Sequence, residues 1–412
     1  MITNGKNDRR PAGGGRIGTR AGAGTVYLDN AATTFPKPDS VIRAVENAMV
    51  TLGGNPGRSS HSLSAAAADA VYSARELIAA FFGSGKPENV IFTPNATAAL
   101  NLAIKTLVPY PCHILISDIE HNSVLRPVAA LAEKGWRYSV YRVGESDEET
   151  EENILRLLRR DTRLIAANHS SNICGFSQNA AMIGALCRER GISFVLDASQ
   201  SAGMREIDME RDGIDALCCP GHKGLYGPAG SGFVLFGDRG GERAASAPTV
   251  IEGGSGINSV EPKMPGVLPE RFEAGTVSVP CIMGLKQGIK EVAARGIPAI
   301  AEEENRLRRR IERGLAATEG VRVYRPDLDS GPIALFNIAG LSSEDAAAEL
   351  DRRGVCVRAG LHCAPLAHRK LGTGGDGAVR ASVGMFSSAA AADALIGAVR
   401  EIAAQHREDA EP

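Results

Sequence analysis

The sequence predicts an α/β protein, built on a mostly parallel sheet with a smaller α+β domain beside it. Between about Asn89 and Phe236, short apolar runs rich in β-forming residues alternate with helical patterns. This alternation is typical of repeated βα units and a parallel sheet. A chain of 412 residues is also too long for one ordinary hydrophobic core and fits one large and one small domain.

The strands of the sheet are predicted from seven apolar runs. In chain order these are NVIFT, HILIS, YSVYRV, RLIAAN, ISFVLD, IDALCC and GFVLF. Between them, helices are expected at Ala96–Leu107 and at Asn179–Gly191, where a basic last turn and a glycine are typical of a helix end. Ligands of such sheets bind at the carboxyl ends of strands, so polar residues that directly follow a strand are candidates for function.

The C-terminal third has a different pattern. The segment Gly253–Gly275 is dense in glycine and proline and is predicted to be a long loop that crosses between domains. A long helix is expected from about Pro280 to Gly314, broken near Gly296–Pro298. The strand-like RVYRP and ALFNI and the helical SSEDAAAELDRRG and AAAADALIGAVREIAAQ then predict the small α+β domain.

These patterns divide the chain into three parts. Residues 1–24 are rich in Gly and Arg without an apolar run, which indicates a flexible tail rather than a signal peptide or a membrane helix. A transit peptide is the less favoured alternative, because Ser is absent. Residues 25–285 form the large domain, with an N-terminal segment that contributes to the small one, and residues 286–412 form the small domain.

Charge and cysteine content exclude several classes of partner. The 46 basic and 48 acidic residues give a net charge of -2, so neither nucleic acid nor an anionic membrane is expected to bind. No stretch approaches the roughly 20 apolar residues that span a bilayer. Eight irregularly spaced cysteines fit neither a disulfide scaffold nor a zinc site, and indicate reduced thiols in the cytoplasm. We therefore expect a small-molecule ligand and no metal.

Two polar residues at strand ends together indicate pyridoxal phosphate. Lys223 lies in PGHKGLYGP, directly after IDALCC; lysine forms Schiff bases when it is desolvated, and neighbouring glycines allow a planar cofactor to approach. Asp197 ends ISFVLD, with Gln200 one turn later. An Asp there is often only a turn former, and a lysine is often only a surface residue. The cofactor, however, needs an anion at its pyridine nitrogen, which the pair supplies.

Two further strand ends supply an anion site and an imidazole. In NVIFTPNATAALN, the helix beginning at Ala96 and Thr97 offers unpaired backbone N–H groups and a hydroxyl that suit a phosphate. Helix capping by Asn95 or Thr97 is an alternative that is compatible with phosphate binding. His121 follows HILIS and could lie flat on a cofactor ring and transfer protons, although a single His is more often structural.

The small domain supplies a nucleophile and a cation. Cys363 lies in VRAGLHCAP, beside His362 and five residues after Arg358, and these basic neighbours favour a thiolate. It is the best candidate nucleophile among the eight cysteines. Arg380, in GAVRASVGMF, could hold a substrate carboxylate through two parallel hydrogen bonds, or be an ordinary surface arginine.

In this order the motifs resemble the cysteine desulfurase and selenocysteine lyase family of the class V aminotransferase group. The resemblance extends from about Tyr27 to Ala403 and rests on YLDNAATTFPKP, GRSSHSLS, EHNSV, SSNICG, DASQ, PGHKGLYGP, FEAGT, VRAGLHCAP and VRASVGMF. It implies the type I pyridoxal-phosphate fold, whose large domain has a mostly parallel seven-stranded sheet and binds the cofactor. It also implies a homodimer with active sites at the subunit interface.

Residue by residue, the resemblance implies a role for each motif. Lys223 carries the cofactor through a Schiff base, Asp197 pairs with the pyridine nitrogen, and Gln200 contacts the ring oxygen. His121 stacks on the ring and takes part in catalysis, and Cys363 forms the persulfide. The remaining implied ligands bind the phosphate (Ala96, Thr97, His222 and, from the neighbouring subunit, Thr276) or line the substrate site (Asn172, Arg358, Arg380, Arg58 and His61).

The sequence departs from the family at two phosphate positions. Relatives commonly have Ser or Thr where this chain has Ala96 and Pro220, so two hydroxyl donors are missing. Each lost hydrogen bond to a charged group costs on the order of 1–3 kcal/mol if nothing replaces it. We expect backbone N–H groups to replace these donors.

The implied reaction is the removal of sulfur from L-cysteine, giving L-alanine and a persulfide on Cys363 that passes to a thiol acceptor protein, for iron–sulfur clusters or another sulfur pathway. Alternatives with the same cofactor are selenocysteine lysis, transamination and epimerisation, and VRAGLHCAP favours sulfur or selenium chemistry. A non-catalytic scaffold of a sulfur-assembly complex is a further alternative, which the intact Lys223, Asp197 and Cys363 disfavour.

Overall fold

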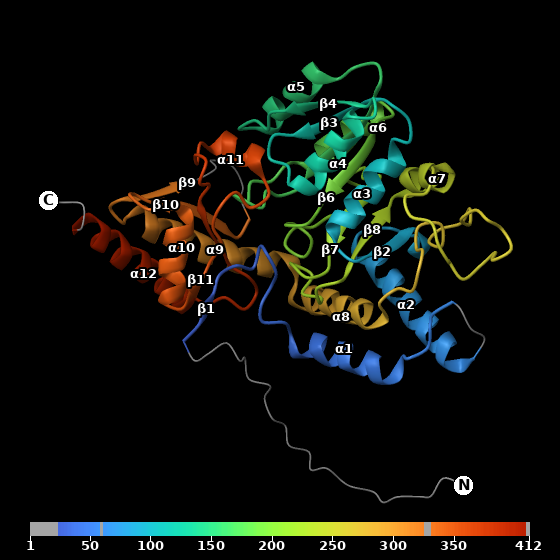
Figure 1. The fold of residues 1–412 in the computed structure, drawn as a ribbon, viewed down its shortest axis with the longest axis horizontal. Coiled ribbons are helices and arrows are strands. Elements are labelled where there is room, and N and C mark those ends of the chain that lie inside the picture. Colours follow the sequence, from blue (N-terminus) through green and yellow to red (C-terminus); the bar gives the residue numbers. More distant parts are fainter. Residues whose placement is uncertain (1–23, 58–60, 325–330, 409–412) are drawn as a thin grey trace, which may run out of the picture.

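A computed structural model describes residues 24–57, 61–324 and 331–408. Within these ranges the predicted α/β class is confirmed (Figure 1). All but the last residue of the predicted tail lies outside the described residues. None of the described helices is long and apolar enough to cross a membrane.

The large sheet has the seven predicted strands. Its spatial order is β2-β8-β7-β6-β5-β3-β4, and only β8 runs antiparallel to its neighbours. Four of the strands are completely buried along their length, which explains why they are continuous apolar runs rather than alternating ones. The strands are β2 (Val90–Thr93), β3 (His113–Ser117), β4 (Arg137–Tyr141), β5 (Thr162–Asn168), β6 (Ser193–Asp197), β7 (Ala216–Pro220) and β8 (Gly232–Phe236).

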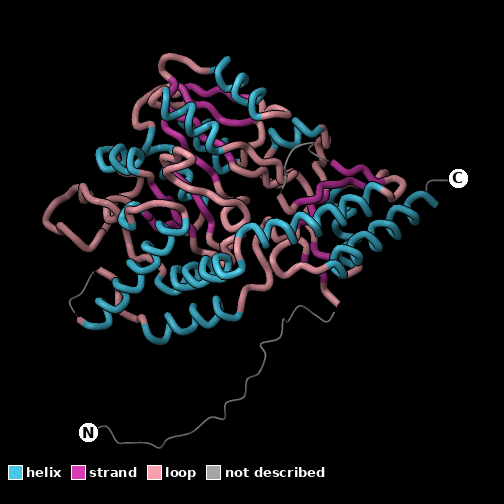
Figure 2. Tube along the Cα trace, turned by 180° about the vertical axis from the view of Figure 1, so that it is seen from behind, coloured by secondary structure: helices cyan, strands magenta, loops and turns pink. Residues whose placement is uncertain are grey.

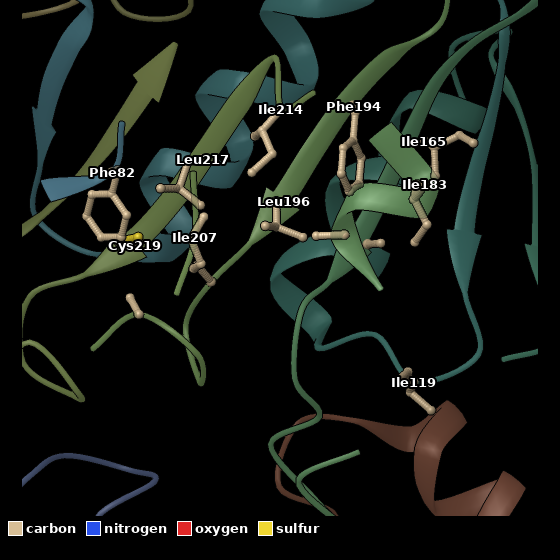
Figure 3. Packing of buried hydrophobic residues seen from close by; sticks show 14 of the residues in the cluster. Phe82, Ile119, Ile165, Ile183, Phe194, Leu196, Ile207, Ile214, Leu217 and Cys219 are labelled. Carbon is tan, nitrogen blue, oxygen red and sulfur yellow. The ribbon is translucent and has the colours of Figure 1, made fainter. Parts of the chain in front are cut away.

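Helices cover both faces of this sheet, so successive strand residues enter two different cores. Leu164 packs with one set of helices and Ile165 with the other, and Val195 and Leu196 divide in the same way. Figure 3 shows part of the core that contains Ile165 and Leu196. One face carries α3 (Ala96–Leu107), α4 (Asn122–Ala132) and α7 (Asp238–Ser246); the other carries α2 (Ser62–Phe81), α5 (Asp147–Leu157), α6 (Ala180–Glu189) and α8 (Val279–Arg295).

The glycine- and proline-rich segment does not cross between domains, so that prediction is wrong. No helix or strand lies between α7 and α8, and both of these helices pack on the large sheet. The loop is fixed to the edge of that sheet, because Glu273 pairs with Arg75 at 2.6 Å and accepts a hydrogen bond from the backbone N–H of Phe92. Helix α1 (Asp39–Thr51) lies alongside α8 (Figure 1), and η1 (Pro87–Asn89) precedes β2.

The small domain has its own hydrophobic core. It contains an antiparallel sheet of order β12-β10-β9, and the long helices α9 and α12 lie side by side (Figure 2). The predicted helix break is confirmed at Gly296, whose φ is 84°. The predicted boundary at residues 285/286 falls within α8 and stays a prediction. The elements are α9 (Ile297–Ala316), β9 (Val321–Tyr324), β10 (Ile333–Ile338), α10 (Ser343–Arg352), α11 (Pro365–Leu371), β12 (Val379–Ser382) and α12 (Ala389–Glu408).

The N-terminal segment joins this smaller body. Strand β1 (Val26–Tyr27) pairs in parallel with β11 (Val355–Cys356), and Leu28 is part of the same hydrophobic cluster. The chain therefore enters the structure at the small domain before it reaches α1. This brings the motif YLDNAATT beside strand β12, because Asn30 donates hydrogen bonds to the carbonyl of Ser382.

Candidate active site

The candidate residues meet at the carboxyl edge of the large sheet. Strands β2, β3, β5, β6 and β7 run in the same direction, so the segments that follow them leave from the same edge. The last residues of these strands or the segments that follow them carry Ala96 and Thr97, His121, Asn172, Asp197 and Lys223, respectively. The structure therefore brings this set of candidate residues to one edge of the sheet.

Lys223 lies in a partly buried position that disfavours its charged form. Burial lowers the pKa of its ammonium to about 8; the positive charges of Arg380 and Arg358 act in the same direction, and the charge of Asp197 opposes them. Its backbone is held by Thr34, whose hydroxyl donates to the Lys223 carbonyl at 3.0 Å. The amine is thus closer to its nucleophilic, neutral form than an ordinary lysine.

Asp197 is the last residue of β6 and Gln200 follows it, and each side chain already has a hydrogen-bond partner. Asp197 is 4% exposed, and its Oδ1 accepts from the backbone N–H of Ser199 at 2.9 Å and from the Ser199 hydroxyl. The Gln200 amide donates to the carbonyl of Ala31 at 3.0 Å. Asp197 raises the pKa of both Lys223 and His121 electrostatically, which places its charge close to both groups.

A hydroxyl chain connects the predicted phosphate end to His121. The Thr97 hydroxyl lies 2.8 Å from the Ser123 hydroxyl, which lies 2.9 Å from Nδ1 of His121. This Nδ1 also accepts from the backbone N–H of Ser123 at 3.0 Å. Because Nδ1 accepts, a neutral ring carries its proton on Nε2, and burial lowers the pKa of His121 so that the neutral ring is favoured.

The start of α3 keeps donors for an anion. Asn95 caps the helix by accepting from the N–H of Ala98 at 2.9 Å, so capping by Asn95 is confirmed. Among the described residues, no hydrogen bond engages the N–H groups of Ala96 or Thr97. On the Lys223 loop, Nδ1 of His222 is likewise buried without a partner from the described residues.

Cys363 differs from the other seven cysteines in its exposure. It is the one exposed cysteine, while five are buried and Cys281 and Cys356 are half-buried; all eight are free thiols. Its carbonyl accepts from the backbone N–H of Asn122, next to His121, at 2.7 Å. The carbonyl of His362 accepts from the Asn172 amide at 2.9 Å. These two bonds attach the Cys363 loop to the large domain.

Arg380 is buried rather than on the surface, so the surface alternative is wrong. It is 1% exposed. One terminal nitrogen donates to Asp29 at 2.8 Å and the other to the carbonyl of Asn172 at 2.9 Å, while Nε has no partner among the described residues. Both terminal nitrogens are thus already engaged, and the expected pair of parallel bonds to a substrate carboxylate is not freely available. Arg358 is exposed and adjoins Arg380 through backbone hydrogen bonds.

For three predicted residues the structure shows no contact with Lys223: two have other partners, and the third lies outside the described residues. Thr276 is exposed and accepts from the Asn55 amide at 3.2 Å, with no contact to the Lys223 group among the described residues. His61 caps α2 by accepting from the N–H of Ser64. Arg58 lies outside the described residues. The role of Thr276 in a neighbouring subunit stays a prediction.

Sequence reasoning missed several residues of the site. Asp29 pairs with Arg380, Ser123 joins Thr97 to His121, and Lys37 donates to the carbonyl of His222 at 2.8 Å. Glu120 is fully buried beside Asp197, and burial raises its pKa to about 8. All four lie within or directly beside motifs that the sequence shows, YLDNAATTFPKP and EHNSV. Their position in those motifs was the available signal.

Comparison with known families agrees with this geometry. The model of the Aminotransferase class-V family matches residues 26–395. The chain belongs to the class-V aminotransferase family. A "Probable cysteine desulfurase" of Methanothermobacter thermautotrophicus is 31% identical over 92% of this chain and 94% of that protein, and "Probable cysteine desulfurase 2" of Mycobacterium leprae is 32% identical over 92% of each.

Solved structures of class-V members have the same fold. A cysteine desulfurase from Thermococcus onnurineus NA1 in its apo form superimposes with a TM-score of 0.84 at 30% identity, covering 92% of this chain and 95% of that one. The cysteine desulfurase CsdA from Escherichia coli gives 0.82 at 25% identity, with 93% and 95% covered. The type I fold that the sequence predicted is therefore confirmed.

The cofactor of this class-V chain is pyridoxal 5′-phosphate, and the described residues fit it. An amine with a lowered pKa, a buried carboxylate and a half-buried imidazole meet at one edge, at Lys223, Asp197 and His121. Unpaired donors at the start of α3 and the unpartnered Nδ1 of His222 suit an anionic group. These residues would hold the ring and the phosphate.

Proposed function

We propose that this chain is a cysteine desulfurase, which converts L-cysteine to L-alanine and leaves the sulfur as a persulfide on Cys363. The observation that carries the proposal is the placement of Cys363. The exposed thiol lies on a loop that is hydrogen-bonded to Asn122 and Asn172, directly beside His121 and Arg380. The names of the relatives support the same reaction.

The bound cofactor supplies an electron sink that stabilises negative charge on the substrate carbon. Lys223 holds the cofactor and, when released, is a base for the substrate α-proton, because its lowered pKa of about 8 favours the neutral amine. His121 presents a proton at Nε2, since Nδ1 is engaged by the N–H of Ser123. Arg358 and the free Nε of Arg380 attract the substrate carboxylate.

The sulfur transfer balances without a further reagent. The Cys363 thiolate attacks the substrate sulfur, the substrate carbon–sulfur bond breaks, and a sulfur–sulfur bond forms on the enzyme. The carbon fragment keeps the electron pair of the broken bond and takes up a proton, which gives L-alanine. The persulfide then passes its terminal sulfur to the thiol of an acceptor protein, for iron–sulfur clusters or another sulfur pathway in the cytoplasm.

The test is to measure alanine and persulfide from L-cysteine, with L-selenocysteine in parallel. The variant Cys363→Ala should lose alanine formation from cysteine while it still binds the substrate, because the nucleophile is absent. Selenocysteine turnover can survive, since selenium leaves without attack by a thiol. Cys281→Ala is the matched control, because Cys281 is half-buried on α8 outside this site. Undiminished cysteine turnover in Cys363→Ala contradicts the proposal.

A further inference from the structure

Two buried histidines, His362 in the Cys363 loop and His368 in α11, are hydrogen-bonded to each other. Their side chains have no part in the chemistry above. Nδ1 of His362 lies 3.2 Å from Nε2 of His368, and Nδ1 of His368 lies 2.7 Å from the Thr373 hydroxyl. At the other end, Nε2 of His362 lies 3.3 Å from the carbonyl of Arg358. His362 and His368 are 5% and 2% exposed, and their rings are stacked.

The hydrogen bonds of this histidine pair have one consistent direction. The Arg358 carbonyl only accepts, so Nε2 of His362 must donate. A neutral imidazole has one N–H, so Nδ1 of His362 accepts from Nε2 of His368, and Nδ1 of His368 accepts from the Thr373 hydroxyl. Burial lowers the pKa of both rings, that of His362 to about 3, which keeps them neutral. Every ring nitrogen is then satisfied.

The hydrogen-bonded histidine pair adjoins an unusual backbone conformation. His362 and Cys363 have φ angles of 48° and 59°, so two successive residues with side chains are left-handed. Such a conformation persists only where the surroundings fix it. Here the His362 and Cys363 carbonyls are bonded to Asn172 and Asn122, and the His362 ring is held from below by His368.

We propose that His368 is a positioning residue for the Cys363 thiol. Through its N–H to His362 it fixes the left-handed turn that presents the thiol to the substrate sulfur. This inference rests on the proposed function. Attack on the substrate sulfur requires a well-aligned thiol. The groups proposed to attract the substrate carboxylate, the Arg358 and Arg380 side chains, lie outside the two left-handed residues. Loss of the His368 donor should therefore slow sulfur transfer and leave binding intact.

The experiment compares His368→Leu with His368→Gln, whose amide N–H replaces the imidazole donor. In single turnover with L-cysteine, persulfide formation in His368→Leu should be about tenfold slower or more. The L-cysteine concentration that gives half of the cofactor absorbance change should be the same as in the parent. His368→Gln should recover most of the rate. Hydrogen exchange of peptides spanning residues 118–124 and 360–366, which needs no substrate, should be about threefold faster or more in His368→Leu alone.

Two further variants keep the result interpretable. Thr373→Val removes the hydroxyl that orients His368 and should slow persulfide formation less than His368→Leu does. It replaces His368→Leu in the test if that variant does not fold. His113→Gln, a buried histidine at the opposite end of β3, should leave both readouts unchanged. The inference is overturned if either readout of His368→Leu, or of Thr373→Val in its place, matches the parent, or if His368→Gln is as slow as His368→Leu. A parent that makes no alanine overturns the proposed function instead, and the exchange measurement then decides the turn separately.

Discussion

At Lys223, burial and two guanidinium groups act against the positive charge of the amine and lower its pKa to about 8. The neutral amine is the form that captures an aldehyde. Loading of the cofactor onto the apo-protein should therefore become faster as the pH rises, by about tenfold per unit well below pH 8, and level off above it. Stopped-flow absorbance measures this rate.

The matched variant for this prediction is Arg358→Gln, which removes one of the two positive charges. The pH midpoint of its loading rate should shift upward, because removing a neighbouring positive charge raises the pKa of the Lys223 ammonium. Lys223→Arg should not be loaded at all. A midpoint near the ordinary lysine value of 10.5 in the parent contradicts the effect of burial.

Ala96 and Pro220 test how the phosphate is held. The N–H groups of Ala96 and Thr97 have no partner among the described residues, so they are available in place of the missing hydroxyls. Ala96→Thr and Pro220→Ser should therefore leave cofactor affinity close to that of the parent. Equilibrium titration of the apo-protein measures it, and a large gain in either variant would show that the backbone donors do not compensate.

At the scale of elements, α8 determines how closely the Lys223 loop can approach. A Cβ on Gly288 would lie 2.9 Å from the backbone nitrogen of Gly227 and closer still to the Leu225 carbonyl. Gly288→Ala should lower the free energy of unfolding by about 1–3 kcal/mol and weaken cofactor binding, because the loop must move. Denaturant unfolding and cofactor titration measure the two effects.

Gly397 in α12 provides the control for this substitution. A Cβ there would meet nothing within 4 Å, so Gly397→Ala should stabilise the helix by about 0.5–1 kcal/mol and leave cofactor binding unchanged. If both alanine variants behave alike, the explanation that Gly288 allows α8 to approach the loop closely is wrong.

At the scale of the whole molecule, apolar side chains on α1 and α2 favour the homodimer that the family resemblance implies. Val50 is 78% exposed, Leu63 57% and Tyr72 51%, and Tyr72 lines the same surface pocket as Thr276. Exposed apolar side chains mark interaction surfaces where they adjoin one another, and the double variant below tests whether these do. The double variant Leu63→Lys, Tyr72→Lys should be monomeric by light scattering. It should also bind the cofactor more weakly, because the predicted contact of Thr276 with the neighbouring site would be lost.

Leu155→Lys is the control. This side chain is 40% exposed and belongs to α5, a helix that lies well away from α1 and α2 (Figure 1). It should remain dimeric with normal cofactor binding. A monomeric parent protein, or a double variant that stays dimeric, contradicts the proposed interface.

The sequence determined most of the elements and the candidates for the site residues, because these depend on local patterns. The helix predicted at Ala96–Leu107 has the same bounds in the structure, since its strand, cap and apolar spacing are adjacent in the chain. Lys223, Asp197 and Cys363 were identified from motifs of a few residues. The loop Gly253–Gly275 was misplaced because its composition indicates only that it is irregular, whereas its position depends on the pair Arg75–Glu273.

Only the tertiary structure decided how these residues work together. Arg380 is buried against Asp29, a residue 351 positions earlier, and Ser123 connects Thr97 to His121 across two helices. The left-handed turn at Cys363 likewise depends on carbonyl contacts with Asn122 and Asn172 from the large domain. A motif specifies which groups are present, but their partners, burial and pKa values arise from segments that only folding brings together.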